Sequence, residues 1–243
     1  RARTGCPCVR TPANRRRLMT CCRKASGQEG SRRAAKSQHT REQILDATLR
    51  CLVSAGYAHS TIDTIASRAG VSRGAMTHHF PSRADLFREF GPYLVDLRIA
   101  EYEEVVRRIS ARMNGLPTPA NMRETVNLLH HRYFNRPSLL ALEELLLGAR
   151  TDVALRDIAG MAQRELDRRE MAVRTACLPV WKGLDASSEL LRDMMTNVLT
   201  SLAITPAHLM SSERHEHLCD LMAAVSMNEF SRAYAALKPA GPA

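Results

Sequence analysis

Residues 61–80 read TIDTIASRAGVSRGAMTHHF, and this stretch decides the fold. Its first apolar residues recur at i, i+3, i+4 and i+7, the spacing of one helix face: Ile62, Ile65, Ala66 and Ala69. Gly70 follows, and glycine takes the left-handed position that ends a helix without a Cβ penalty. Ser72 can then cap a second helix by accepting from its first free N–H groups. The stretch therefore predicts two short helices joined by a tight turn.

The second of these helices has an apolar inner face and a polar outer one. Met76 and Phe80 lie four residues apart and face inward. Arg73 can donate two hydrogen bonds to guanine, Thr77 offers a hydroxyl and a methyl group, and His78 can donate to phosphate. Gly74 lowers helix stability relative to alanine, which fits a close backbone approach to DNA. This pattern predicts a helix-turn-helix that enters the major groove, although apolar spacing alone would also suit an ordinary helical hairpin.

The flanking sequence makes the DNA-binding interpretation specific. Upstream, TREQILDATLRCLVSAGY (40–57) predicts a helix with a capping box at Thr40 and Gln43 and a stop at Gly56. Downstream, PSRADLF (81–87) breaks the second helix and opens another. The segments TREQILDA, GY, TIDTIASRAGVSRGAMTHHF and PSRADLF together resemble the tetracycline-repressor (TetR) family of bacterial regulators. The resemblance covers residues 40–90 and implies a three-helix DNA-binding head.

The resemblance also implies roles for particular residues and for the rest of the chain. Arg83 is similar to the basic residue that contacts phosphate in the family, whereas Thr77 stands where the family often has tyrosine. The predicted DNA-contacting residues are Thr61, Ser72, Arg73, Gly74, Thr77, His78 and Arg83. Implied partners are a pseudopalindromic double-stranded operator, a second copy of the chain and a small effector that releases the DNA. Repression in the cytoplasm is the family default.

The chain has 243 residues and a net charge of +10, but this charge is confined to one end. The first 40 residues hold 11 of the 35 Lys and Arg residues and one of the 25 acidic residues, so the remainder is neutral. Residues 1–39 show no helical apolar period and predict a disordered basic arm. No apolar signal-peptide core precedes Met19, the first methionine, where we hypothesise that translation begins. The arm leaves open an alternative function as a non-specific nucleic-acid-binding protein.

Residues 91–243 predict a second, helical domain for ligand binding and dimerisation, which makes the chain all-α. Helices are expected from residue 82 to 113 with a bend at Pro92, and over 119–134, 137–149, 152–178, 186–204 and 212–237. Glu170 and Arg174 are expected to form an ion pair on the outer face of their helix. In the family the last two helices form the dimer interface, here predicted at Leu190, Leu191, Met194, Val198, Leu202, Leu218, Met222 and Val225. The alternative is that both faces belong to the internal core.

A ligand pocket is harder to assign from the sequence, because a methionine stripe at helical spacing is also typical of a plain core. The expected walls are Met113, Met122, Leu129, His130, Tyr133, Leu147, Met161, Trp181 and Met195. Such a lining suits a hydrophobic or aromatic effector.

Enzyme and metal chemistry find no support in the motifs. The chain has no glycine-rich phosphate loop, H-E-x-x-H or G-x-S-x-G motif. The doublets 130–131 and 143–144 each place only one side chain on a given helix face. The seven cysteines are odd in number and scattered, which argues against disulfides and fits a reducing compartment. We therefore predict no catalysis, no metal, no cofactor and no membrane span.

Overall fold

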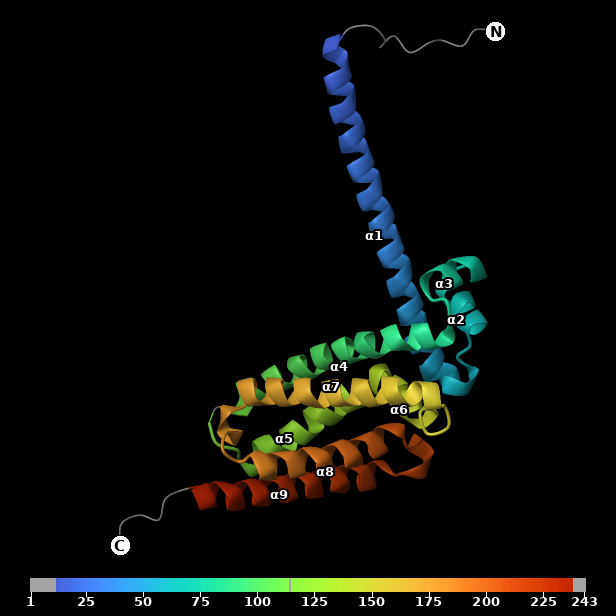
Figure 1. The fold of residues 1–243 in the computed structure, drawn as a ribbon. Coiled ribbons are helices and arrows are strands. Elements are labelled where there is room, and N and C mark those ends of the chain that lie inside the picture. Colours follow the sequence, from blue (N-terminus) through green and yellow to red (C-terminus); the bar gives the residue numbers. More distant parts are fainter. Residues whose placement is uncertain (1–11, 114, 238–243) are drawn as a thin grey trace.

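The computed structural model describes residues 12–113 and 115–237, and within them it is entirely helical (Figure 1). A small head of three helices sits at one end of a larger helical body, and a long N-terminal helix projects from the head. The α-helices are α1 (Pro12–His59), α2 (Ile62–Ala69), α3 (Arg73–His79), α4 (Arg83–Met113), α5 (Pro119–Leu129), α6 (Pro137–Gly148), α7 (Val153–Cys177), α8 (Asp185–Ile204) and α9 (Ser212–Leu237). No helix in the described part of the chain is long and apolar enough to cross a membrane.

The helix-turn-helix forms as the sequence predicts. Thr61 caps α2 and pairs with Thr64 in a capping box, and Gly70 ends α2 with φ of 69° and ψ of 28°. Ser72 then caps α3, its hydroxyl accepting from the Ala75 N–H at 3.1 Å. The backbone N–H and C=O groups at helix ends have no partner within the helix, and these local hydrogen bonds supply one. Helices α2 and α3 therefore begin and end at defined residues.

The N-terminal arm departs from its prediction of disorder. The structure continues α1 back to Pro12, so this prediction is wrong for residues 12–39; residues 1–11 lie outside the described part. The segment is rich in Arg, Lys, Ala and Gln, which favour helix, and proline occurs only at its first residue. Figure 1 shows this part of α1 leaving the body without a neighbouring helix. A helix without tertiary contacts is marginally stable in water.

Two apolar cores divide the folded body. The first joins the head to the domain behind it, because Ile44, Phe87 and Met76 share a core with Leu145 of α6 and Ile158 of α7. The second packs the far half of α4 with α5, α8 and α9 around Val126 and Leu199. Helix α7 runs along α4 and contributes residues to both cores. The head is therefore packed directly onto α6 and α7 and does not hang from a linker.

The remaining predicted helices are found within one or two residues of their expected ends, with two differences. Helix α4 runs through Pro92 without a break. The helix predicted over 119–134 is α-helical only to Leu129 and ends in a π-helical turn, His130–Phe134. The buried thiols Cys51 and Cys219 are free, as expected of small apolar residues.

Candidate functional site

The outer face of α3 is exposed and polar. The Arg73 side chain is 77% exposed, and its Nη1 lies 3.2 Å from Asp63 Oδ1 on α2. An ion pair this exposed contributes little stability, so Arg73 can exchange Asp63 for another acceptor at small cost. His78 and Thr77 are also exposed, although the Thr77 hydroxyl donates to the Arg73 and Gly74 carbonyls.

The small residues of this surface leave the backbone accessible. A Cβ added to Gly74 would meet only the Ser72 hydroxyl, 4.0 Å away, so nothing covers α3 at that point. Thr61 and Ser72 stand exposed at the starts of α2 and α3, where both hydroxyls act as caps. Helix N-termini favour negative charge, as a phosphate would supply. Six of the seven predicted DNA-contacting residues thus lie on the exposed surface of the helix-turn-helix.

Arg83 is the exception, and the structure corrects its predicted phosphate contact. Its Nη2 donates to the Tyr57 carbonyl at 2.6 Å and its Nε to the Ser60 carbonyl at 3.2 Å. The guanidinium also covers the Tyr57 ring, 4.0 Å from the centroid. Both carbonyls lie where α1 ends and the chain turns toward α2, and Arg83 points inward to bind them. In this conformation the phosphate prediction for Arg83 is wrong.

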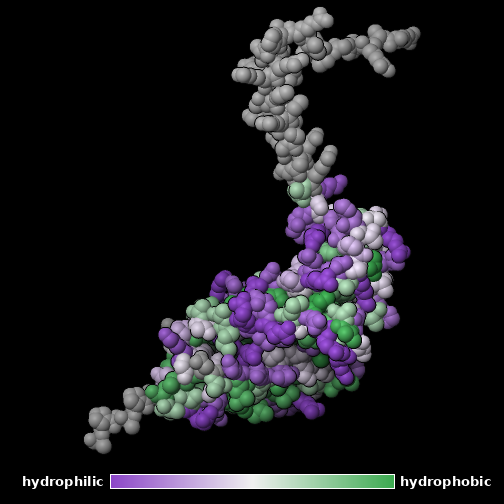
Figure 2. Space-filling model, viewed as in Figure 1, coloured by the Kyte–Doolittle hydropathy of each residue, from purple (hydrophilic) through white to green (hydrophobic). Residues whose placement is uncertain are grey.

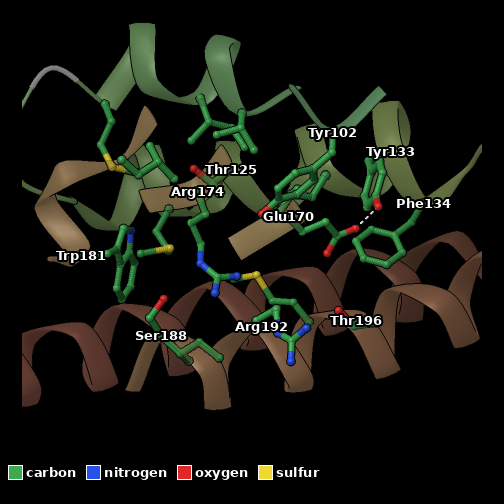
Figure 3. Close-up of a pocket in the computed structure, with 18 residues that line it drawn as sticks. Tyr102, Thr125, Tyr133, Phe134, Glu170, Arg174, Trp181, Ser188, Arg192 and Thr196 are labelled. Atoms are coloured by element: carbon green, nitrogen blue, oxygen red, sulfur yellow. Dashed lines mark hydrogen bonds between the residues drawn. The ribbon is translucent and has the colours of Figure 1, made fainter. Parts of the chain in front are cut away.

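A cavity of about 90 Å³ lies between α4, α5, α7 and α8 (Figure 3). Its walls are mostly apolar and aromatic and include six of the nine predicted pocket residues: Met113, Met122, Leu129, Tyr133, Trp181 and Met195. The apolar periodicity of α4 and α5 points these side chains inward, and the loop after α7 brings Trp181 to one end.

Three residues predicted for the pocket lie elsewhere. Leu147 and Met161 are 52% and 54% exposed, because they lie on the outward sides of α6 and α7. His130 is buried but packs against His215, with ring centroids 4.5 Å apart. Burial first, and then the neighbouring His215 and His131, lower the pKa of His130 to about 4. These three assignments to the pocket are wrong.

The polar residues of the cavity were not anticipated from the sequence. Glu170 and Arg174 were expected to be an exposed ion pair, but both are buried in the cavity wall and do not pair with each other. Tyr133 donates its hydroxyl to Glu170 (Figure 3). Arg174 donates to the sulfur of Met171. The i, i+4 spacing of the two charged residues beside Leu166 and Val173 was the available signal, since it places them on the apolar side of α7.

The charges of the wall are set by its burial. Burial raises the pKa of Glu170, and the hydrogen bond from Tyr133 and the charge of Arg98 only partly oppose this shift. Burial likewise raises the pKa of Tyr102 to about 12. Among the described residues, no three His, Cys, Asp or Glu side chains converge closely enough to hold a metal ion.

Comparisons with known proteins agree with the helix-turn-helix. The model for bacterial regulatory proteins of the tetR family matches residues 44–90, which contain α2 and α3. The transcriptional regulator CymR of Pseudomonas putida is 27% identical over 192 residues, covering 76% of this chain and 88% of CymR. A second regulator of Pseudomonas putida, SrpR, is 40% identical over 55 residues, covering 23% of this chain and 26% of SrpR. Residues 44–90 form a DNA-binding domain of the tetR family of bacterial regulatory proteins.

Solved structures support the fold beyond this domain as well. A TetR-family regulator from Mesorhizobium loti superposes with a TM-score of 0.61 at 17% identity, covering 81% of this chain and 96% of that one. At this identity the likeness concerns the fold alone. TetR-family regulators are not enzymes, which confirms the prediction of a non-catalytic protein.

A short set of polar contacts ties the head to the helix that lines the cavity. Tyr57, at the end of α1, donates its hydroxyl to Asp152 at 2.6 Å and its N–H to Glu144 of α6 at 2.9 Å. Asp152 also caps α7 by accepting from the N–H groups of residues 154 and 155. Helix α7 therefore contacts the head at one end and carries Glu170 and Arg174 toward the other.

The C-terminal helices leave an apolar surface on the outside of the body. Leu190 is 64% and Leu221 60% exposed, Val225 is also exposed, and Met194, Val198 and Leu218 are half-buried. Figure 2 shows hydrophobic residues gathered along the lower edge of the body, where Figure 1 places α8 and α9. Leu191, Leu202 and Met222 instead point into the core of their own chain. Because they offer no surface to a partner, their assignment to the dimer interface is wrong.

Proposed function

We propose that this protein is a cytoplasmic, dimeric TetR-family repressor that binds a pseudopalindromic operator and is released from it by a small effector. The observation that carries the proposal is the exposed polar face of α3, on which Arg73, Thr77 and His78 stand clear of the apolar core. A recognition helix reads base edges with such side chains while capped helix ends contact phosphates. Arg73 is the strongest candidate for a base contact, because its exposed pair with Asp63 is readily exchanged.

Two copies of this head are needed for selective binding. One short helix contacts few base pairs, whereas a two-fold dimer reads two half-sites about one helical turn apart. The exposed apolar face at Leu190, Leu221 and Val225 supports dimer formation through α8 and α9, since isolated patches of this kind mark interaction surfaces. The spacing of the two heads then depends on how each head sits on its own body.

The shared core and the Tyr57–Asp152 contact support an effector switch. A ligand in the cavity contacts α7, and α7 packs on the head through Ile158 and bonds it through Asp152. A ligand that prefers one position of α7 would shift the population of head positions. Release requires that the ligand bind the non-matching state more tightly than the DNA-bound state.

Selection of genomic DNA fragments by the purified protein at near-physiological salt tests the proposal. The wild type is expected to enrich one inverted repeat, and Arg73→Ala to lose that enrichment. Arg88→Ala is the matched control, because Arg88 is also exposed and paired with an aspartate, Asp85, but both residues lie on α4 and outside the recognition helix. The alternative, non-specific binding by the basic arm, predicts a different result. In that case all fragments would be captured uniformly, the Arg73→Ala variant would still capture them, and deletion of residues 1–38 would abolish the capture.

A further inference from the structure

The cavity wall contains one buried cation without an anion. Arg174 is only 8% exposed, and its Nη2 donates to the thioether sulfur of Met171 at 3.0 Å. Among the side chains that the structure describes, none forms an ion pair with Arg174. The Tyr102 hydroxyl also hydrogen-bonds with Arg174. A thioether and a hydroxyl carry no negative charge, and a buried charge without a counterion is costly.

The other charged groups of the wall already have partners. Arg192 pairs with Asp167 at 3.0 Å and with Asp193 at 2.7 Å. Glu170 accepts the hydroxyl of Tyr133. The remaining wall is apolar apart from hydroxyl groups such as Thr125, Ser188 and Thr196. Arg174 is therefore the group in this wall whose charge is least compensated.

Glu170 and Arg174 differ in how they can respond to burial. A carboxyl group can take up a proton and become neutral, and burial favours this by raising the pKa of Glu170. A guanidinium remains charged at every physiological pH. The cavity wall thus retains a positive charge on Arg174 even when Glu170 is protonated.

We propose that Arg174 is the anion-binding residue of the cavity and that its ligand is a small carboxylate with a single hydrophobic ring. A guanidinium matches a carboxylate with two parallel hydrogen bonds, and the shape of that pair gives selectivity as well as strength. The cavity of about 90 Å³ is smaller than the cavity of about 150 Å³ that holds benzene, so it limits the ligand to a single ring, which enters only when side chains of the wall move apart. Tyr102, Phe134 and Trp181 supply aromatic walls for that ring. This assignment rests on the proposed function, in which the cavity is the effector site.

Three probes of nearly equal shape separate charge from hydrophobicity: benzoate, benzamide and benzamidinium. Binding of each to the full chain is measured by calorimetry and by the shift in melting temperature. Benzoate is expected to bind at least 10-fold more tightly than benzamide, and benzamidinium more weakly than either. Arg174→Met should weaken benzoate binding by about 10- to 100-fold, as expected for a charge-assisted hydrogen-bonded pair.

Controls keep this test independent of folding. Arg168→Met makes the same change on the same helix at an exposed position outside the cavity, and it should bind benzoate as the wild type does. Arg174→Lys retains the charge but not the two parallel donors, so it should recover part of the affinity. Both variants are compared with the wild type for their melting temperature without ligand.

Different failures of the test are distinguishable. Benzamide or benzamidinium binding as tightly as benzoate would overturn the anion site, and so would absence of binding by all three probes or full benzoate affinity in Arg174→Met. Release of DNA is measured separately on the operator complex. Benzoate binding that depends on Arg174 but leaves the operator complex intact would support the anion site and contradict the effector switch.

Discussion

Gly148, at the end of α6, lies at a tightly packed contact between the head and the body. A Cβ at this position would lie 2.6 Å from Cδ1 and 2.7 Å from Cγ of Tyr57, and 3.0 Å from Cδ2 of Leu155. We therefore expect Gly148→Ala to push the Tyr57 ring away from α6. The ring cannot turn freely, because its hydroxyl is bound to Asp152 and Arg83 covers its face.

Two effects of opposite sign determine the size of this change. Replacing glycine by alanine in a helix stabilises by roughly 0.5–1 kcal/mol, and by less at a terminal residue such as Gly148. Overpacking a filled core costs about 1–3 kcal/mol. A loss of about 1–2 kcal/mol of unfolding free energy is the expected balance, with weaker coupling between cavity and head because the Tyr57–Asp152 bond is displaced.

Urea denaturation of the Gly148→Ala and Gly160→Ala variants measures this balance. Gly160 lies inside α7, where a Cβ would meet only the flexible end of Arg164 at 3.3 Å, so Gly160→Ala should stabilise by up to about 1 kcal/mol. A Gly148→Ala protein as stable as the wild type, with an unchanged dependence on urea, would refute the tight contact between Gly148 and Tyr57.

Three other predictions address the corrected residues and the dimer. Burial holds the pKa of His130 at about 4, so its contribution to stability is complete above pH 6.5 and is lost as the pH falls toward 4; His130→Leu should flatten this acid loss, by up to about 3 kcal/mol, in denaturation measured across that range. Arg83→Gln should cost about 1–2 kcal/mol of unfolding free energy. If this variant also lowered the slope of log affinity for DNA against log salt concentration by about one, Arg83 would contact a phosphate after all. Leu221→Glu should yield monomers in analytical ultracentrifugation, whereas Leu116→Glu should remain dimeric, because Leu116 is also an exposed leucine but lies outside α8 and α9; a dimeric Leu221→Glu would contradict the interface.

Local chemistry explains which parts of the fold could be predicted. The cap at Thr61, the left-handed Gly70 and the cap at Ser72 all act within four residues, so the sequence alone specifies them. The later helices could also be predicted from local sequence, because the first and last residues of each apolar stripe indicate where the helix begins and ends. The N-terminal helix was missed because a segment without an apolar face gives no periodic signal.

The site residues depended more on tertiary placement. Arg83 follows a helix break, and it points inward because it binds the carbonyls of Tyr57 and Ser60, which lie more than 20 residues earlier. Glu170 and Arg174 have the spacing of a surface ion pair, and only the packing of α7 against α4 and α8 shows that both are buried. Apolar periodicity correctly predicted that Met122 lines the cavity. The positions of the charged side chains could be seen only in the folded structure.

The most direct test of the account is the ratio of affinities for the selected inverted repeat and for a scrambled duplex of equal length, measured at the same salt concentration. The wild type is expected to show a ratio of at least about 10³, and Arg73→Ala a ratio at least 10-fold smaller. Deletion of residues 1–38 should weaken binding to both duplexes equally and preserve the ratio. A ratio that is unchanged in Arg73→Ala but lost with residues 1–38 would contradict sequence recognition by α3.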